Sequence, residues 1–194
     1  PDRTTWAGRR DHALLLLAVQ TGLRLSEITG LRAADVRLGT GAHVHVLGKG
    51  RKERCTPLAK QTQAVLRSWM SRDLGPEPAI LFPSARGSRL SADGVQYLVA
   101  KHVATAGRAC PSMTRKRVTP HVLRHTTAME LLQAGVDRSV IAMWLGHESL
   151  ETTQIYLDAD LTLKERVLDK VAHPSVQARR YRPEDKLMAF LSAL

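Results

Sequence analysis

Residues 21–31 read TGLRLSEITGL, and this stretch predicts a break between two helices of a mainly helical fold. An apolar helical block over residues 10–20 precedes it, and Gly22 is the kind of residue that ends a helix in the left-handed conformation. Ser26 is a good N-cap for a second, short helix. Arg24 therefore follows directly on a helix break.

The rest of the chain reads as a small sheet followed by more helices. Val44 and Val46 alternate with polar neighbours, which is typical of a strand, and residues 53–58 return as its partner after a glycine turn. Further helices are expected over residues 60–72, 92–107, 120–134, 137–146 and 161–171, with a short one around Tyr156. We therefore expect a mainly α chain with a small antiparallel β-sheet, an α+β fold in which one domain spans residues 1–172 and a C-terminal tail spans residues 173–194.

Composition points to a polyanionic partner. The 194 residues are 43% hydrophobic and 24% charged, which excludes a disordered chain, and the net charge is +11. Residues 49–60 and 101–117 carry balances of +4 and +5, so two short stretches hold most of the surplus. Aromatic residues make up only 4%, which disfavours a single-strand binder that stacks bases. Double-stranded DNA is the expected partner.

Several classes of protein are disfavoured by what the sequence lacks. Two cysteines are too few for a disulfide framework or a paired-cysteine zinc site, and they fit a cytoplasmic protein. No apolar run approaches the ~18 residues that a membrane span needs. The common metal-binding motifs are also missing, so we expect no metal, no cofactor and no membrane partner.

Each candidate functional residue has an ordinary structural role open to it when taken alone. Lys49 on a glycine-flanked turn could be a solvated lysine, and Tyr156 on a short helix could simply pack. His121 and Arg124 lie three apart on one helix and project from one face, as many structural pairs do. His147 follows Gly146 at a helix end, where a cation commonly meets the helix dipole.

The joint pattern is much more specific. In order, the chain carries TGLRLSEITGL, then GKGRKER at residues 48–54, HVLRH at 121–125, LGH at 145–147, and Tyr156 nine residues after that histidine. This set resembles the catalytic domain of the tyrosine recombinases, the phage integrase family, whose motif order is Arg, Lys, His-x-x-Arg, His or Trp, Tyr. The resemblance covers residues 11–168 and implies that fold.

The resemblance implies metal- and ATP-independent cutting and rejoining of duplex DNA in recombination or integration, as for mobile elements. Tyr156 would attack the scissile phosphate to give a 3′-phosphotyrosyl link, and Lys49 would protonate the departing 5′-oxygen, with Lys52 as a local rival for that role. Transfer of a phosphodiester also needs a cationic clamp, for which planar guanidinium groups are suited. The clamp would be Arg24 and Arg124.

The remaining expected roles are supporting ones. His121 and His147 would donate to the non-bridging oxygens and help to move the nucleophile's proton. Glu27 could hold Arg24, or be an acid in the first turn of a helix, and His125 reads as a buried structural histidine. Expected DNA contacts come from the basic stretches: Arg51, Lys52, Arg54, Arg115, Lys116 and Arg117.

The family resemblance also implies larger assemblies. Members carry a separate helical core-binding domain, which is expected to be missing from this chain, and they act as tetramers on two DNA sites while exchanging a C-terminal segment. Two alternatives remain open at this point. A type IB topoisomerase shares the chemistry, and a non-catalytic DNA-binding regulator would use residues 137–156 as a helix-turn-helix pair.

Overall fold

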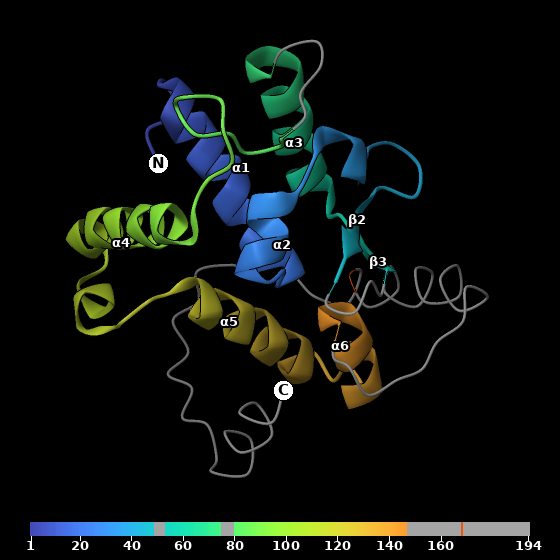
Figure 1. Cartoon of the computed structure of the whole chain (residues 1–194). Helices are drawn as coiled ribbons and strands as arrows, with labels where there is room; N and C mark the ends of the chain where they lie inside the picture. The colour runs from blue at the N-terminus through green and yellow to red at the C-terminus, as the bar shows by residue number, and fades with distance from the viewer. Residues whose placement is uncertain (49–52, 75–79, 147–167, 169–194) are drawn as a thin grey trace.

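The computed structural model describes residues 1–48, 53–74, 80–146 and 168. It is mainly helical with one small antiparallel sheet, which confirms the expected fold class (Figure 1). In chain order the elements are α1 (Trp6–Thr21), α2 (Leu25–Gly30), the 3₁₀ turn η1 (Ala33–Asp35), β1 (Val36–Arg37), β2 (His43–Leu47), β3 (Glu53–Pro57), α3 (Lys60–Asp73), α4 (Ala92–Ala109), the 3₁₀ turn η3 (Pro111–Arg115), α5 (Pro120–Gln133) and α6 (Arg138–Leu145).

The sheet has the strand order β1-β2-β3, with both pairs antiparallel. Val44 pairs with Thr56 and Val46 pairs with Arg54. Directly opposed residues share one face of a sheet, so these four side chains project to the same side. All four are buried, which identifies this face as the one turned toward the helices.

The ends of the first two helices position the candidate site. α1 begins at Trp6, earlier than predicted, because the Thr5 side chain caps it, and it ends at Thr21 with Gly22 as its C-cap at φ +63°. The prediction that Ser26 caps α2 was wrong: Arg24 is the N-cap, and Ser26 lies inside the helix. The Glu27 carboxylate accepts a hydrogen bond from the Arg24 backbone N–H at 2.7 Å, which satisfies a donor that the helix leaves unpaired.

Two hydrophobic clusters form the core. The larger one is built around α1, with residues such as Leu17, and adds residues from α3, α4 and the sheet, such as Trp69 of α3. The smaller one joins α5 to α6 around Trp144. Hydrogen bonds link the two clusters, because the Trp144 Nε1–H donates to the Thr21 carbonyl and the Thr127 hydroxyl donates to the Val19 carbonyl. α6 and α5 are thus both attached to the C-terminal end of α1.

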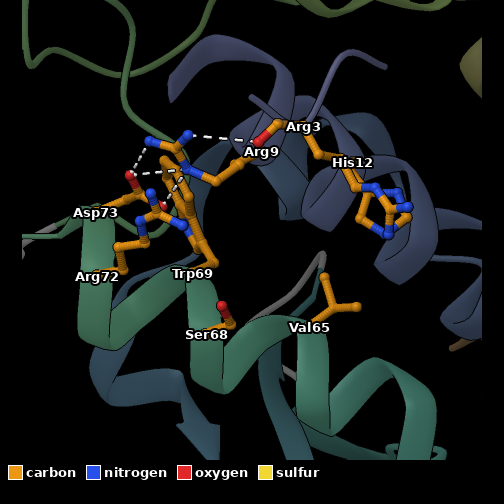
Figure 2. A pocket seen from close by; sticks show the side chains of 8 residues that line it. All are labelled: Arg3, Arg9, His12, Val65, Ser68, Trp69, Arg72 and Asp73. Atoms are coloured by element: carbon orange, nitrogen blue, oxygen red, sulfur yellow. Dashed lines mark hydrogen bonds and ion pairs between the residues drawn. The ribbon is translucent and has the colours of Figure 1, made fainter. Parts of the chain in front are cut away.

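An ion pair ties the opposite end of α1 to α3. Arg9 donates from Nη2 to the Asp73 carboxylate at 2.7 Å, and its Nη1 also donates to the Arg3 carbonyl at 3.4 Å (Figure 2). Arg3 and His12 line the same pocket, where burial first, and then the nearby Arg3 charge, lowers the His12 pKa. Across the described part of the chain, no helix is both long enough and apolar enough to span a bilayer.

Replacing Gly22 by alanine tests how closely α6 is packed onto the end of α1. A Cβ there would lie 2.6 Å from Leu145 Cδ2 and 3.2 Å from Thr127 Cβ, at φ +63°. Backbone strain alone costs about 1 kcal/mol, and overpacking adds about 1–3 kcal/mol. Gly41→Ala is the matched control, since Gly41 has φ +64° with nothing within 4 Å of the new Cβ. In urea denaturation, Gly22→Ala should lose more free energy of unfolding than Gly41→Ala does. Equal losses for the two variants would contradict the close packing of Leu145 and Thr127 against Gly22.

Candidate functional site

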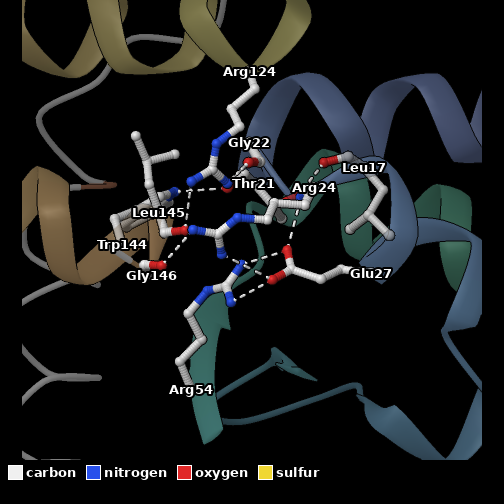
Figure 3. A network of polar contacts seen from close by, with 10 residues as sticks. All are labelled: Leu17, Thr21, Gly22, Arg24, Glu27, Arg54, Arg124, Trp144, Leu145 and Gly146. Carbon is white, nitrogen blue, oxygen red and sulfur yellow. Dashed lines mark hydrogen bonds and ion pairs between the residues drawn. The ribbon is translucent and has the colours of Figure 1, made fainter. Parts of the chain in front are cut away.

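Three arginine side chains from separate elements gather beside one carboxylate, and two of them bind it. Arg24 comes from the α1–α2 junction, Arg54 from β3 and Arg124 from α5, and Figure 3 shows the three guanidinium groups pointing into one region beside Glu27. Three cations against one carboxylate leave two positive charges within this cluster. The site therefore has the charge of an anion-binding site before any ligand is added.

Arg24 connects Glu27 to the end of α6. Its Nη1 donates to Glu27 Oε1 at 3.2 Å, and its Nη2 donates to the Gly146 carbonyl at 2.7 Å. The side chain keeps 31% of its surface exposed. Arg24 is thus held at both ends of its fork and still accessible from outside.

Arg124 is the buried member of the cluster. Its Nη1 donates to the Gly22 carbonyl at 2.5 Å and its Nη2 to the Leu145 carbonyl at 2.7 Å. These carbonyls lie at the C-terminal ends of α1 and α6, where helix dipoles favour a cation. Burial, and then repulsion from Arg24 and Arg54, lowers the Arg124 pKa to about 10, while Glu27 opposes that change. The side chain remains a cation at neutral pH.

Glu27 is a fully occupied anion. Its two oxygens accept from the Arg24 backbone N–H, Arg24 Nη1, and Nη1 and Nη2 of Arg54. An ionised carboxylate offers about four acceptor positions, so this set fills them. Burial would raise the Glu27 pKa, but the hydrogen bonds and charge of Arg54, together with Arg24, outweigh burial and lower it. Glu27 is both the first-turn acid and the partner of Arg24, so the two expected roles coincide.

Arg54 was expected to contact DNA, but the structure places it inside. Its residue surface is only 6% exposed, and both its terminal nitrogens bind Glu27, at 2.8 and 2.7 Å. The strand alternation carries a signal for this placement, because Arg54 lies two residues before buried Thr56 and is paired with Val46 on the same, inner face of the sheet. A count of basic residues in the hairpin does not separate its two faces.

The two histidines of the α5 motif touch each other. His121 is the second residue of α5 and is exposed, while Arg124 lies one turn further into the fold. The Nε2 atoms of His121 and His125 are 2.5 Å apart, so one ring donates a hydrogen bond to the other. Burial first, and then the neighbouring His121 and Arg124, lowers the His125 pKa. His125 is half-buried and partners His121 directly, so it is less enclosed than expected.

A basic segment leads directly into this helix. Arg115 ends η3, and Lys116 and Arg117 follow it; all three side chains are exposed. The turn is held against α4, because a Cβ on Gly107 would lie 2.8 Å from Thr114 Cγ2. The exposed positive charge therefore lies on a packed segment that runs toward the α5 N-terminus.

The structure thus brings together Arg24, Glu27 and Arg124, with Arg54 added, and places His121 and His125 on the helix that carries Arg124. The expected residues Lys49, Arg51, Lys52, His147 and Tyr156 lie outside the described residues, as does the tail at 173–194. In the described part of the chain, no three His, Cys, Asp or Glu residues are grouped so that they could hold a metal ion.

Comparisons with known proteins agree on one family. The model for the phage integrase family matches residues 3–162. The protein y4rC of Sinorhizobium fredii, provisionally named an integrase/recombinase, is 63% identical over 194 residues, covering 100% of this chain and 58% of that protein. Tyrosine recombinase XerC of Pelobacter propionicus is 39% identical over 179 residues, which is 92% of this chain and 56% of that protein.

A solved structure extends the similarity to three dimensions. The crystal structure of the site-specific recombinase XerH bound to its difH substrate, a pre-cleavage complex, aligns with a TM-score of 0.64 and 27% identity. The alignment covers 85% of this chain and 44% of that one. This chain therefore spans about half the length of the curated relatives and of the solved structure that it matches.

Glu27→Gln tests the central anion through the pH dependence of stability. The Glu27 pKa is lower in the folded state than its ordinary value of 4.5, so Glu27 stabilises the fold above that pH, and this contribution is lost as the pH falls through the folded pKa. The free energy of unfolding of Glu27→Gln at pH 7 should be about 3–5 kcal/mol lower than that of wild type, since the substitution leaves buried arginines without their counterion.

Acid unfolding curves of wild type and Glu27→Gln measure this difference. The variant should show a weaker fall in stability below pH 4.5 than wild type does. Glu53→Gln is the control, because Glu53 pairs with His45 at the surface and its side chain is 53% exposed. A Glu27→Gln variant as stable as wild type at pH 7, with an unchanged acid response, would refute the role given to this carboxylate.

Proposed function

This chain belongs to the phage integrase family, and on that premise we propose that it is the catalytic part of a tyrosine-type site-specific recombinase. Its substrate would be duplex DNA, to which the +11 net charge is suited, and the similar XerH recombinase was solved bound to its difH substrate. The observation that carries the proposal is the convergence of Arg24 and Arg124 on consecutive carbonyls, those of Gly146 and Leu145. Two guanidinium forks at one place suit a phosphodiester with two non-bridging oxygens.

The proposed reaction exchanges one phosphodiester for another. The Tyr156 phenolic oxygen gives up its proton with the help of His121 and His147 and bonds to the scissile phosphorus. The bond from phosphorus to the 5′-oxygen breaks, and the product is a 3′-phosphotyrosyl link with a free 5′-hydroxyl. Lys49 supplies the proton that the 5′-oxygen takes up. The reverse attack by a 5′-hydroxyl reseals the strand, and because the phosphodiester energy is kept in the covalent link, no ATP is needed.

The arginines supply the positive charge that this transfer needs. Negative charge grows on the phosphate oxygens in the transition state, and fixed cations in a shielded site stabilise it strongly. Arg124 is shielded by burial, and Arg24 is accessible. His121 and His147 would add hydrogen bonds to the same oxygens, with His125 setting which nitrogen of His121 carries the proton.

The exposed basic segment is proposed to bind the DNA backbone. Arg115, Lys116 and Arg117 precede α5, so they would hold phosphates near the one that reacts. By family resemblance, the working unit would be a tetramer on two DNA sites, linked through the C-terminal tail.

A nicked suicide substrate tests the reaction. Loss of the short cut fragment prevents resealing, so wild type should accumulate a protein–DNA adduct that survives denaturant, with a chelator present. Tyr156→Phe should bind the DNA and give no adduct. Arg124→Ala should slow adduct formation about 100-fold or more, and lower DNA affinity far less. Adduct formation by Tyr156→Phe, or a wild type that requires a divalent metal, would overturn the proposal.

The salt dependence of DNA binding tests the basic segment. Removing one lysine or arginine that binds a phosphate should reduce the slope of log K against log salt by about 0.9. Lys116→Ala/Arg117→Ala should therefore flatten the slope measurably. Arg67→Ala/Arg72→Ala removes the same charge from exposed positions on α3, at the opposite end of the fold in Figure 1, and should leave the slope nearly unchanged. Equal slopes for the two double variants would reject the assignment.

A further inference from the structure

Arg54 is the arginine whose position no catalytic role explains. It lies on the inner face of β3, and its side chain is 8% exposed, against 31% for Arg24. It binds Glu27 through two parallel hydrogen bonds, the geometry in which an arginine and a carboxylate fix each other's orientation (Figure 3). A side chain so enclosed has little surface left to offer to a nucleic acid.

Glu27 transmits the position of Arg54 to Arg24. Arg54 takes one acceptor position on each carboxylate oxygen, at 2.8 and 2.7 Å. The positions that remain accept from the backbone N–H and the Nη1 of Arg24. The carboxylate is therefore oriented by Arg54 on one side, and it holds Arg24 on the other.

Gly146 completes a closed set of contacts. A Cβ at Gly146 would lie 2.7 Å from Arg54 Nη1 and 2.9 Å from Arg54 Cζ, so the turn that ends α6 rests directly on the Arg54 guanidinium. The same turn requires φ +71°, and the Gly146 carbonyl accepts from Arg24 Nη2. Arg54 thus touches both groups that hold the Arg24 side chain.

We infer that Arg54 is a positioning residue, which aligns the Arg24 guanidinium through Glu27 and supports the turn at Gly146. This inference rests on the proposed function, since Arg24 is taken as part of the phosphate clamp. Without Arg54, half of the acceptor positions on Glu27 are vacated, and Arg24 is drawn into a closer pair with the carboxylate. The clamp would then be misplaced while the outer DNA-binding surface stays intact.

The test compares Arg54→Met, Glu27→Gln and the double variant in single-turnover adduct formation at saturating suicide substrate. Arg54→Met should lower the rate about 100-fold, as expected for a misplaced reacting group. Its DNA dissociation constant should stay within about threefold of wild type. When Glu27→Gln is already present, adding Arg54→Met should lower the rate of adduct formation by less than about threefold, because Arg54 acts through Glu27. The double variant also removes both buried charges, which protects folding.

Two further variants separate positioning from general stability. Arg54→Lys keeps the positive charge but lacks the planar guanidinium that makes two parallel hydrogen bonds. Its rate of adduct formation should therefore exceed that of Arg54→Met by less than about tenfold. Arg9→Met removes another shielded arginine–carboxylate pair, that with Asp73 (Figure 2), and should lower the melting temperature with the rate within about twofold of wild type.

Three results would overturn the inference: an unchanged rate for Arg54→Met, a loss of DNA affinity as large as its loss of rate, or independent, multiplying effects of the Arg54 and Glu27 changes. If wild type forms no adduct, the proposed function fails separately. A crystal structure of Arg54→Met then still tests the inference. The inference predicts that the Arg24 side chain no longer donates to the Gly146 carbonyl, and it is wrong if that hydrogen bond is kept.

Discussion

The pairing of one buried carboxylate with surrounding guanidinium groups is the interaction on which the rest of this site depends. Arg24, Arg54 and Arg124 repel one another, and burial removes the water that would screen them. Glu27 makes their approach possible by supplying a negative charge with no acceptor position left unused. The carboxylate is therefore an internal counterion, and it leaves a positive excess for a ligand to neutralise.

The arginines also hold the fold together at the junction between its two hydrophobic clusters. The larger hydrophobic cluster around α1 and the smaller one between α5 and α6 meet at the C-terminal ends of α1 and α6. Helix ends leave carbonyls without intrahelical partners. Arg124 and Arg24 donate to three of these carbonyls, so cations suited to phosphate transfer also join the two clusters. Stability and activity should therefore be coupled for changes at this junction.

Much of this arrangement can be predicted from the sequence, and the reasons for the rest are physical. Gly22 and Gly146 end their helices in the left-handed conformation, as their residue type indicates. The N-cap of α2 is Arg24 and not the predicted Ser26, because the Glu27 carboxylate accepts from the Arg24 backbone N–H and the helix can begin there without a serine cap. Arg54 reads as a DNA contact from charge alone, whereas its strand register turns it inward. Contacts across more than a hundred residues, such as Arg24 with Gly146, have no local signal beyond the joint motif.

The central claim is that the converging arginines meet the negative charge of a single backbone phosphate. The most direct measurement replaces a non-bridging oxygen of the scissile phosphate by a methyl group, which removes that charge, and compares cleavage by wild type and Arg124→Ala. The account predicts that Arg124→Ala cleaves the ordinary phosphate about 100-fold or more slowly than wild type does, and cleaves the neutral substrate at nearly the wild-type rate. The same loss on both substrates would contradict it, because Arg124 would then act through the fold and not through charge.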